Sequence, residues 1–230
     1  MTKIFCDIAD LKSIRKFEKK KIVKGFTTNP SLIRNAGAKD YASYCKKILK
    51  ITKKPVSIEV FADDVEEIID QGFKINNWGK NVFVKVPVIN SKGKFMGKAI
   101  KHFNENNIKI NITAVYKIGH VKQILKNINK KSSVLISIFA GRMADSGKDP
   151  LPIFKKSLYY AKNFKNVKIL WASVREPYNF LQSKKIGCHI ITVPPNIIEK
   201  IESFGKSYKS LTQQTVNNFL LDSKKSKFKL

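Results

Sequence analysis

Hydrophobic residues in this chain gather in eight short runs, separated by longer stretches of helical period. The runs cover residues 3–8, 24–29, 55–61, 81–88, 108–115, 134–140, 167–174 and 188–194. Between them, apolar residues recur at spacings of three and four, which predicts amphipathic helices at 11–17, 41–49, 65–73, 121–128 and 197–204. Eight strands alternating with helices predict a (β/α)8 TIM barrel, and a doubly wound open sheet is the alternative. No glycine-rich nucleotide-binding loop follows any run, which weakens that alternative.

The two faces of each predicted strand differ in chemistry. Successive side chains of a strand point to opposite sides, so each run divides into two sets. One set is aliphatic and is expected to pack against helices. The other set, which includes Trp171, carries aromatic residues and a few polar ones near the carboxyl end, where barrel active sites are built. We therefore expect one cavity to receive the polar side chains of Asp7, Glu59, Lys85, Asn111, Thr113, Ser137 and Ser173.

Lys85 is the residue of this set with the clearest chemical potential. It lies within an aliphatic strand, and removing an ammonium group from water is costly. A buried lysine that gives up its proton is an amine nucleophile toward a carbonyl. Asp7 and Glu59 at the same rim are candidate proton carriers. The pattern predicts either a Schiff-base lysine assisted by carboxylates or a buried salt bridge.

Composition indicates an ordinary globular protein rather than a membrane or metal protein. The 230 residues are 43% hydrophobic and favour one domain, expected to span 1–222. Residues 223–230 form a charged tail that is expected to fray. No apolar stretch or leader pattern indicates a membrane span or export. Three cysteines without a CxxC motif, and histidines without ligand spacing, predict a reducing, cytoplasmic compartment and no metal site.

The net charge of +28 comes almost entirely from lysine. Only four of the 45 basic residues are arginine, namely Arg15, Arg34, Arg142 and Arg175. The lysines are spread evenly along the sequence, whereas nucleic-acid binders concentrate charge on one face or tract. A compositional bias toward lysine on solvated faces is therefore the better explanation, and no nucleic-acid partner is expected. An arginine in such a chain can mark a site that needs a flat, bidentate donor.

Five sequence motifs together resemble the transaldolase family, and especially its short branch. They are FTTNPSL at 26–32, VFVKVP at 82–87, INIT at 110–113, SIFAGR at 137–142 and WASVRE at 171–176. The resemblance covers nearly the whole chain. It implies a class I aldolase barrel that acts on phosphorylated sugars, as in the pentose phosphate pathway. It also implies no metal or organic cofactor, because the imine itself accepts the electrons.

The resemblance implies a role for each matched position. Lys85 would form an imine with the C2 carbonyl of a ketose phosphate, and Asp7 would take the proton of the C4 hydroxyl. Glu59 and Thr113 would hold the water that carries protons during imine formation and hydrolysis. The remaining positions would bind substrate: Asn29 and Asn111 at the donor hydroxyls, Ser137 at the reacting end, and Arg142, Ser173 and Arg175 at the phosphate. Thr28 and Phe139 would also bind substrate.

The residues at two positions bear on the choice of reaction. Family members that act as free fructose 6-phosphate aldolases tend to have Gln at the position of Glu59 and Tyr at that of Phe139, so this chain resembles transaldolases more closely. Ile138 replaces a usual proline, and 140–150 departs from housekeeping members. The alternatives are a lyase that releases dihydroxyacetone, a transaldolase of a surface-polysaccharide pathway, and a polyanion-binding barrel without chemistry. The resemblance also implies a homo-oligomer, with a C-terminal helix at about 208–222 reaching a neighbour.

Overall fold

Eight parallel strands close into a barrel, as the eight apolar runs predict. The structure is a computed structural model that describes residues 1–129 and 131–226. Each strand pairs with the next along the chain, and β8 returns to pair with β1 through Lys3 and Ile190. This closure excludes the open-sheet alternative. The strands are β1 (Lys3–Asp7), β2 (Val23–Thr27), β3 (Val56–Glu59), β4 (Val82–Pro87), β5 (Ile110–Val115), β6 (Val134–Phe139), β7 (Val167–Ala172) and β8 (Ile190–Val193).

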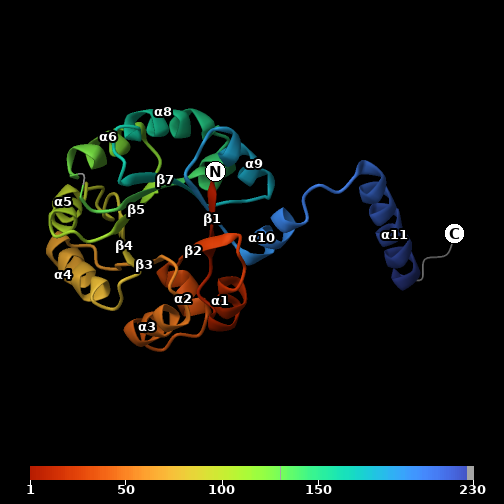
Figure 1. Ribbon diagram of the computed structural model, residues 1–230, viewed down its shortest axis with the longest axis horizontal. Helices are drawn as coiled ribbons and strands as arrows, with labels where there is room; N and C mark the ends of the chain where they lie inside the picture. Colours follow the sequence, from red (N-terminus) through yellow and green to blue (C-terminus); the bar gives the residue numbers. More distant parts are fainter. Residues whose placement is uncertain (130, 227–230) are drawn as a thin grey trace.

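Helices surround the strands as an outer ring (Figure 1). They are α1 (Leu11–Glu18), α2 (Pro30–Asn35), α3 (Tyr41–Ile51), α4 (Val65–Asn76), α5 (Gly97–Glu105), α6 (Ile118–Lys126), α7 (Ala140–Asp145), α8 (Leu151–Ala161), α9 (Tyr178–Lys185), α10 (Pro195–Glu202) and α11 (Tyr208–Ser226). The five helices expected from apolar spacing, α1, α3, α4, α6 and α10, are present, although α6 and α10 each end two residues early. The sequence pattern did not predict α2, α5, α7, α8 or α9.

Aspartates fix the start of three of the predicted helices. Asp10 Oδ2 accepts the backbone N–H of Ser13 at 2.7 Å, and Asp40 Oδ1 accepts that of Ser43 at 2.7 Å. Asp64 Oδ1 plays the same part for α4. Each carboxylate satisfies a backbone donor that has no partner within its own helix. The helices α1, α3 and α4 therefore each begin at the residue that follows an aspartate.

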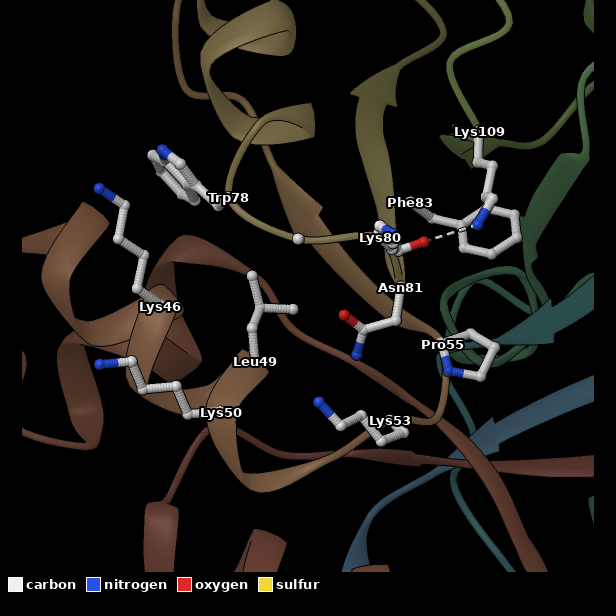
Figure 2. A pocket seen from close by; sticks show the side chains of 11 residues that line it. Lys46, Leu49, Lys50, Lys53, Pro55, Trp78, Lys80, Asn81, Phe83 and Lys109 are labelled. Atoms are coloured by element: carbon white, nitrogen blue, oxygen red, sulfur yellow. Dashed lines mark hydrogen bonds between the residues drawn. The ribbon is translucent and has the colours of Figure 1, made fainter.

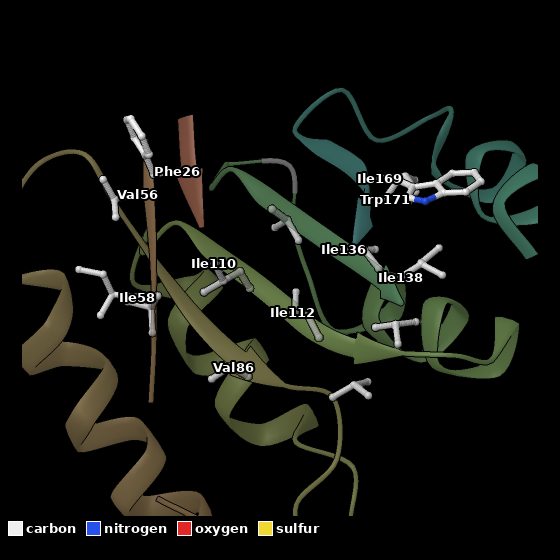
Figure 3. Close-up of a cluster of buried hydrophobic side chains, with 14 of the residues drawn as sticks. Phe26, Val56, Ile58, Val86, Ile110, Ile112, Ile136, Ile138, Ile169 and Trp171 are labelled. Atoms are coloured by element: carbon white, nitrogen blue, oxygen red, sulfur yellow. The ribbon is translucent and has the colours of Figure 1, made fainter. Parts of the chain in front are cut away.

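The main hydrophobic core lies between the strands and the helices. Figure 3 shows the outward faces of the strands, where Ile58, Val86, Ile112 and Ile136 project from neighbouring strands. The same alternation turns a second set of side chains into the barrel. That interior set is Phe5, Leu135, Leu170, Ala172 and Ile190, with Phe83 and Phe139 packed against it. The interior is thus filled with side chains below the cavity described in the next section.

The predicted faces of β7 are reversed. Trp171 was expected inside the barrel, but it packs outward, with its ring stacked on Phe154 of α8 at 4.3 Å between ring centroids. Leu170 and Ala172 take the interior positions instead. Both faces of this strand are apolar, so the pattern alone did not distinguish them. Ser173 still reaches the cavity because its φ of +62° lies in the left-handed region and interrupts the alternation.

The last helix, α11, stands apart from the barrel (Figure 1). It continues to Ser226, four residues beyond the expected end at 222, so the first half of the expected frayed tail is helical. Residues 227–230 lie outside the described residues. No residue of α11 is buried. Among the described residues, no helix combines the length and apolar character that crossing a membrane requires.

Candidate active site

A cavity of about 210 Å³ opens where the strands end at their carboxyl termini. Parallel strands bring their C-terminal ends to one face of the barrel, so residues far apart in the chain meet there. Ten of the twelve predicted site residues line it: Asp7, Asn29, Lys85, Asn111, Thr113, Ser137, Phe139, Arg142, Ser173 and Arg175. Glu59 does not line the cavity but contacts Lys85, which does. Thr28 does not line the cavity.

Lys85 is buried at the bottom of this cavity, with 7% of its surface exposed. Its Nζ lies 2.9 Å from Glu59 Oε2 and donates a hydrogen bond to the carbonyl oxygen of Thr28 at 2.9 Å. The parallel register of β3 and β4 pairs Glu59 directly with Lys85, which makes the two side chains neighbours. The buried salt bridge expected from the sequence is present, and it places a proton acceptor in contact with the amine.

Asp7 is held by a short chain of two threonines. Thr27 Oγ1 donates to Asp7 Oδ1 at 2.6 Å and lies 2.6 Å from Thr192 Oγ1. Because the single Thr27 hydroxyl hydrogen points to the carboxylate, Thr192 must donate to Thr27. Burial raises the pKa of the Asp7 carboxyl above its ordinary value, while the Lys85 charge and the Thr27 hydrogen bond act in the opposite direction. A carboxylate in this state is a better proton acceptor than an exposed one.

A second hydrogen-bond chain links side chains of β3, β5 and β6. Ser137 Oγ donates to Asn111 Oδ1 at 2.6 Å, and Asn111 Nδ2 donates to Ser57 Oγ at 2.9 Å. These contacts define which end of the amide carries oxygen. Thr113 Oγ1 is buried without a hydrogen-bond partner among the described residues. Its hydroxyl is therefore available to water or substrate in the cavity.

The two arginines lie at the rim of the cavity. Arg175 forms a bidentate ion pair with Asp145 of α7, with Nε 3.0 Å and Nη2 2.5 Å from Oδ2. The guanidinium charge and hydrogen bonds lower the pKa of Asp145. The Arg142 guanidinium lies 5.9 Å from the centre of the Phe139 ring. The rim thus presents two cations, one of which is partly neutralised by Asp145.

Thr28 and Asn29, which follow β2, contribute to the site in different ways. Asn29 begins α2, and its Oδ1 accepts the backbone N–H of Leu32 at 2.9 Å. Its amide nitrogen remains free to donate into the cavity. Thr28 is fully buried, and its hydroxyl donates to the carbonyl of Ser57 at 2.8 Å. Thr28 therefore meets Lys85 through its backbone oxygen and not through its side chain.

The sequence analysis did not identify three polar residues of the site as functional candidates. Thr27 and Thr192 hold Asp7, and Ser57 orients Asn111. Ser57 alternates with the aliphatic residues of its run, and Thr27 lies within the FTTNPSL motif, so both carried a usable signal. Thr192 lies in the last run, after His189, as the single polar residue of Ile190–Val193, which is a weak signal.

The cysteines and histidines form no comparable cluster. No group of three or more His, Cys, Asp or Glu side chains that could hold a metal occurs among the described residues. Burial raises the pKa of both Cys45 and Cys188 to about 12, which leaves these thiols unreactive. His189 Nδ1 accepts the backbone N–H of Ile169 at 3.0 Å and serves the fold.

Comparisons with known proteins agree with this geometry. A profile of the family "Transaldolase/Fructose-6-phosphate aldolase" matches residues 4–230. A "Probable transaldolase" of Nitrosopumilus maritimus (strain SCM1) is 34% identical over 229 residues, which cover 98% of this chain and 96% of that protein. Another, from Thermoplasma volcanium, is 33% identical over 97% of this chain and 96% of its own length.

A solved structure supports the fold independently of sequence. A monomeric dihydrodipicolinate synthase variant superposes with a TM-score of 0.61 at 13% identity, over 84% of this chain and 69% of that one. Identity at this level shows the barrel and nothing about the substrate. The family profile and the curated relatives carry the assignment. The chain belongs to the transaldolase/fructose-6-phosphate aldolase family and is an aldolase-type transferase.

Proposed function

We propose that this protein transfers a dihydroxyacetone unit from a ketose phosphate to an aldose phosphate through a Schiff base on Lys85. The observation that carries the proposal is the buried Lys85 Nζ, which lies 2.9 Å from Glu59 Oε2 in a cavity that Asp7 also lines. A buried amine with an acceptor at contact distance and a separate carboxylate nearby supplies the groups that imine chemistry needs.

Imine formation uses the Lys85–Glu59 pair. Glu59 takes a proton from the ammonium, and the neutral amine attacks the C2 carbonyl of the ketose. The resulting carbinolamine loses its hydroxyl as water, which requires a proton to be delivered to that oxygen. Glu59 and the unpaired hydroxyl of Thr113 supply a donor and an orienting group for that water. Hydrolysis after transfer runs the same steps in reverse.

Carbon–carbon cleavage uses Asp7. Its carboxylate takes the proton of the C4 hydroxyl, the C3–C4 bond breaks, and the electron pair moves into the iminium to give an enamine on Lys85. The aldose phosphate leaves with the new carbonyl at its C1. A second aldose phosphate is then attacked by the enamine carbon, and Asp7 returns the proton to the new alkoxide. The raised pKa of Asp7 suits a group that must both accept and donate this proton.

The rest of the cavity holds the two ends of the substrate. Ser137 and Asn111, already linked by a hydrogen bond, face the dihydroxyacetone portion, and the Asn29 amide donates to a donor hydroxyl. Arg142, Ser173 and Arg175 bind the phosphate at the rim, because a guanidinium fork matches the geometry of phosphate oxygens. Phosphate binding competes with Asp145 for the Arg175 guanidinium.

Product analysis with and without an acceptor tests transfer against simple cleavage. We expect fructose 6-phosphate alone to give little free dihydroxyacetone, and addition of erythrose 4-phosphate to give rapid formation of sedoheptulose 7-phosphate. Free dihydroxyacetone released at the same rate in both reactions would instead identify a lyase. Lys85→Ala is the blank for both reactions. Glu59→Gln removes the group that takes the proton from the Lys85 ammonium and is expected to slow both reactions.

The exposed α11 supports assembly into a homo-oligomer. The helix presents Phe219, Leu220 and Leu221 to solvent, each more than half exposed, and such side chains are usually covered by a partner. We propose that α11 packs on a second copy of the chain. The three buried, free cysteines favour a reducing compartment, and we propose the cytoplasm.

A further inference from the structure

The end of the barrel opposite the cavity is lined by lysines and carries a groove of its own. The groove has a volume of about 620 Å³ and lies between α3 and the loop from α4 to β4. Figure 2 shows Lys46 and Lys50 reaching from α3, with Trp78 beside Lys46 and Lys80 further along the loop that precedes β4. Lys53 and Lys109 complete a lining of five lysines that includes no carboxylate.

The fold converts an even spacing of lysines along the sequence into one cationic face. In the described chain, the segments that run from a helix to the next strand contain no aspartate or glutamate, and each segment that leads to β2 through β7 contains at least one lysine. Among the segments that run from strand to helix, those after β1, β3 and β7 hold carboxylates: Asp10, Asp63, Asp64 and Glu176. The helix-to-strand segments all meet at the amino-terminal end of the barrel, which is therefore rich in lysine. Two of these lysines, Lys20 and Lys54, are paired with Glu202 and Glu18 at helix C-termini.

Helix dipoles explain only part of the excess of lysine at the amino-terminal end of the barrel. Helix C-termini also meet at this end, and lysines offset their partial negative charge. Offsetting a helix dipole requires neither a concave surface nor an aromatic ring. Here Lys46 Nζ lies 5.8 Å from the centre of the half-buried Trp78 ring, which lines the groove. Lys109 Nζ is held by the carbonyl oxygen of Lys80 at 2.7 Å.

The cationic lining also continues beyond the groove. A second hollow, at the mouth of the barrel, shares Pro55 and Phe83 with the groove. Its lining adds four lysines and again no carboxylate: Lys3, Lys24, Lys165 and Lys168. A groove of this volume accommodates a small ligand, whereas the adjoining lysines extend past it. A chain of repeated negative charges matches both features.

We infer that this amino-terminal face binds single-stranded nucleic acid, with phosphates on the lysines and a base stacked on Trp78. Lysines that follow a phosphate backbone, combined with an aromatic ring that accepts any base, form the usual surface for single strands. The overall charge of +28 adds long-range attraction. This revises the expectation, drawn from the linear distribution of lysines, that nucleic acid is not a partner. The catalytic cavity lies at the other end and is left open.

Salt-dependent binding of a labelled oligouridine, about 20 nucleotides long, tests the inference. The triple variant Lys50→Gln, Lys53→Gln, Lys80→Gln is expected to reduce the slope of log affinity against log salt by about 2, since roughly 0.7 ions are released per phosphate contact. The matched control, Lys12→Gln, Lys155→Gln, Lys156→Gln, removes the same charge from exposed positions of α1 and α8. It should leave the slope unchanged. Equal losses in both triples would overturn the inference, because they would show attraction to net charge alone.

Fluorescence of Trp78 separates nucleic acid from other polyanions. The chain has two tryptophans, so Trp171→Phe leaves Trp78 as the sole emitter. Oligouridine is expected to quench this emission, and Trp78→Leu is expected to weaken binding about tenfold through the lost stacking. Poly-glutamate or polyphosphate that binds as tightly, with Trp78→Leu having no effect on oligouridine, would overturn the assignment. Aldol activity of the lysine triple should equal that of the wild type, which shows that the variant is folded.

Discussion

At the scale of single residues, the site depends on two carboxylates in different environments. Glu59 is in contact with the Lys85 ammonium, whereas Asp7 is held by neutral hydroxyls. Burial raises the pKa of Asp7 more than the Lys85 charge and the Thr27 hydrogen bond lower it. Two acids with separate environments can perform separate proton transfers. Glu59 serves the amine, and Asp7 serves the sugar hydroxyl.

Replacing Asp7 is expected to abolish activity and stabilise the protein. Because its pKa is raised, the folded state binds the proton more tightly than the unfolded state, and this contribution to stability is lost as pH rises through the raised pKa. Asp7→Asn removes the titration, so its free energy of unfolding at pH 7 should exceed that of the wild type. The catalytic rate should fall by about 10²- to 10⁴-fold.

Urea unfolding at two pH values measures this effect. The difference between Asp7→Asn and wild type should disappear below about pH 4, where the carboxyl is protonated in both states. Asp70→Asn, at an exposed position of α4, is the control and should show no gain at either pH. An Asp7→Asn protein less stable than wild type at pH 7 would mean that the carboxylate serves the fold rather than the reaction.

Arg175 is expected to discriminate phosphorylated from unphosphorylated substrates. Arg175→Ala removes the guanidinium fork and should raise KM for a sugar phosphate by about tenfold or more, since charge-assisted hydrogen bonds contribute about 1.5–3 kcal/mol. The KM for the sugar without phosphate should change little. Steady-state kinetics on both substrates decide the matter, with Arg15→Ala on the exposed face of α1 as control. An equal loss on both substrates would argue against a phosphate contact.

At the scale of elements, sequence patterning predicted the strands well and some faces poorly. Alternation in β4 correctly turned Lys85 inward and its valines outward, because the two faces differ in polarity. The alternation pattern failed in β7. Trp171 and Leu170 are both apolar, and only the packing of Trp171 against Phe154 determines which of the two faces outward. The contacts of Thr192 with Thr27 join residues 165 positions apart, and no local pattern carries such information.

The approach of α7 to the loop after β7 depends on Gly141. A Cβ at this position would lie 1.7 Å from the carbonyl oxygen of Ser173, so a larger residue must displace the phosphate-binding rim. Gly141→Ala is expected to lower the free energy of unfolding by roughly 1–3 kcal/mol and to raise KM for sugar phosphates. Thermal unfolding and kinetics measure both effects.

Gly119 in α6 provides the matched control. A Cβ there meets nothing within 4 Å, so Gly119→Ala should be neutral or stabilising by up to about 1 kcal/mol. If both alanine variants behaved alike, the close packing of α7 on Ser173 would not matter to the site.

At the scale of the whole molecule, the barrel has three separate surfaces. The carboxyl end of the strands carries the cavity, the amino end carries the lysines, and α11 projects away from both (Figure 1). The lysines are evenly spaced along the sequence, so the sequence alone did not reveal the lysine-rich amino-terminal surface. A (β/α)8 fold returns to the same end of the barrel once in every βα unit, and this brings those lysines together. The three surfaces are therefore distinguished by where their residues lie in the fold and not by amino-acid composition.

The apolar side chains of α11 are expected to hold the oligomer together. Phe219 and Leu220 are 69% and 52% exposed in the isolated chain. Phe219→Ser combined with Leu220→Ser should reduce the mass measured by light scattering from a multiple of 26.2 kDa to 26.2 kDa. Asn217→Ser with Asn218→Ser, on the same helix, should leave the assembly intact. A wild-type protein that already has the mass of one chain would refute this expectation.

Chemical trapping of the imine tests the central claim most directly. Borohydride reduces an iminium to a stable secondary amine, so incubation with fructose 6-phosphate and borohydride should fix a sugar-derived adduct on the protein. Peptide mass spectrometry is expected to find that adduct on Lys85 and to find none in Lys85→Ala. An adduct on another lysine, or an active enzyme that borohydride and substrate leave unmodified, would contradict the proposed mechanism.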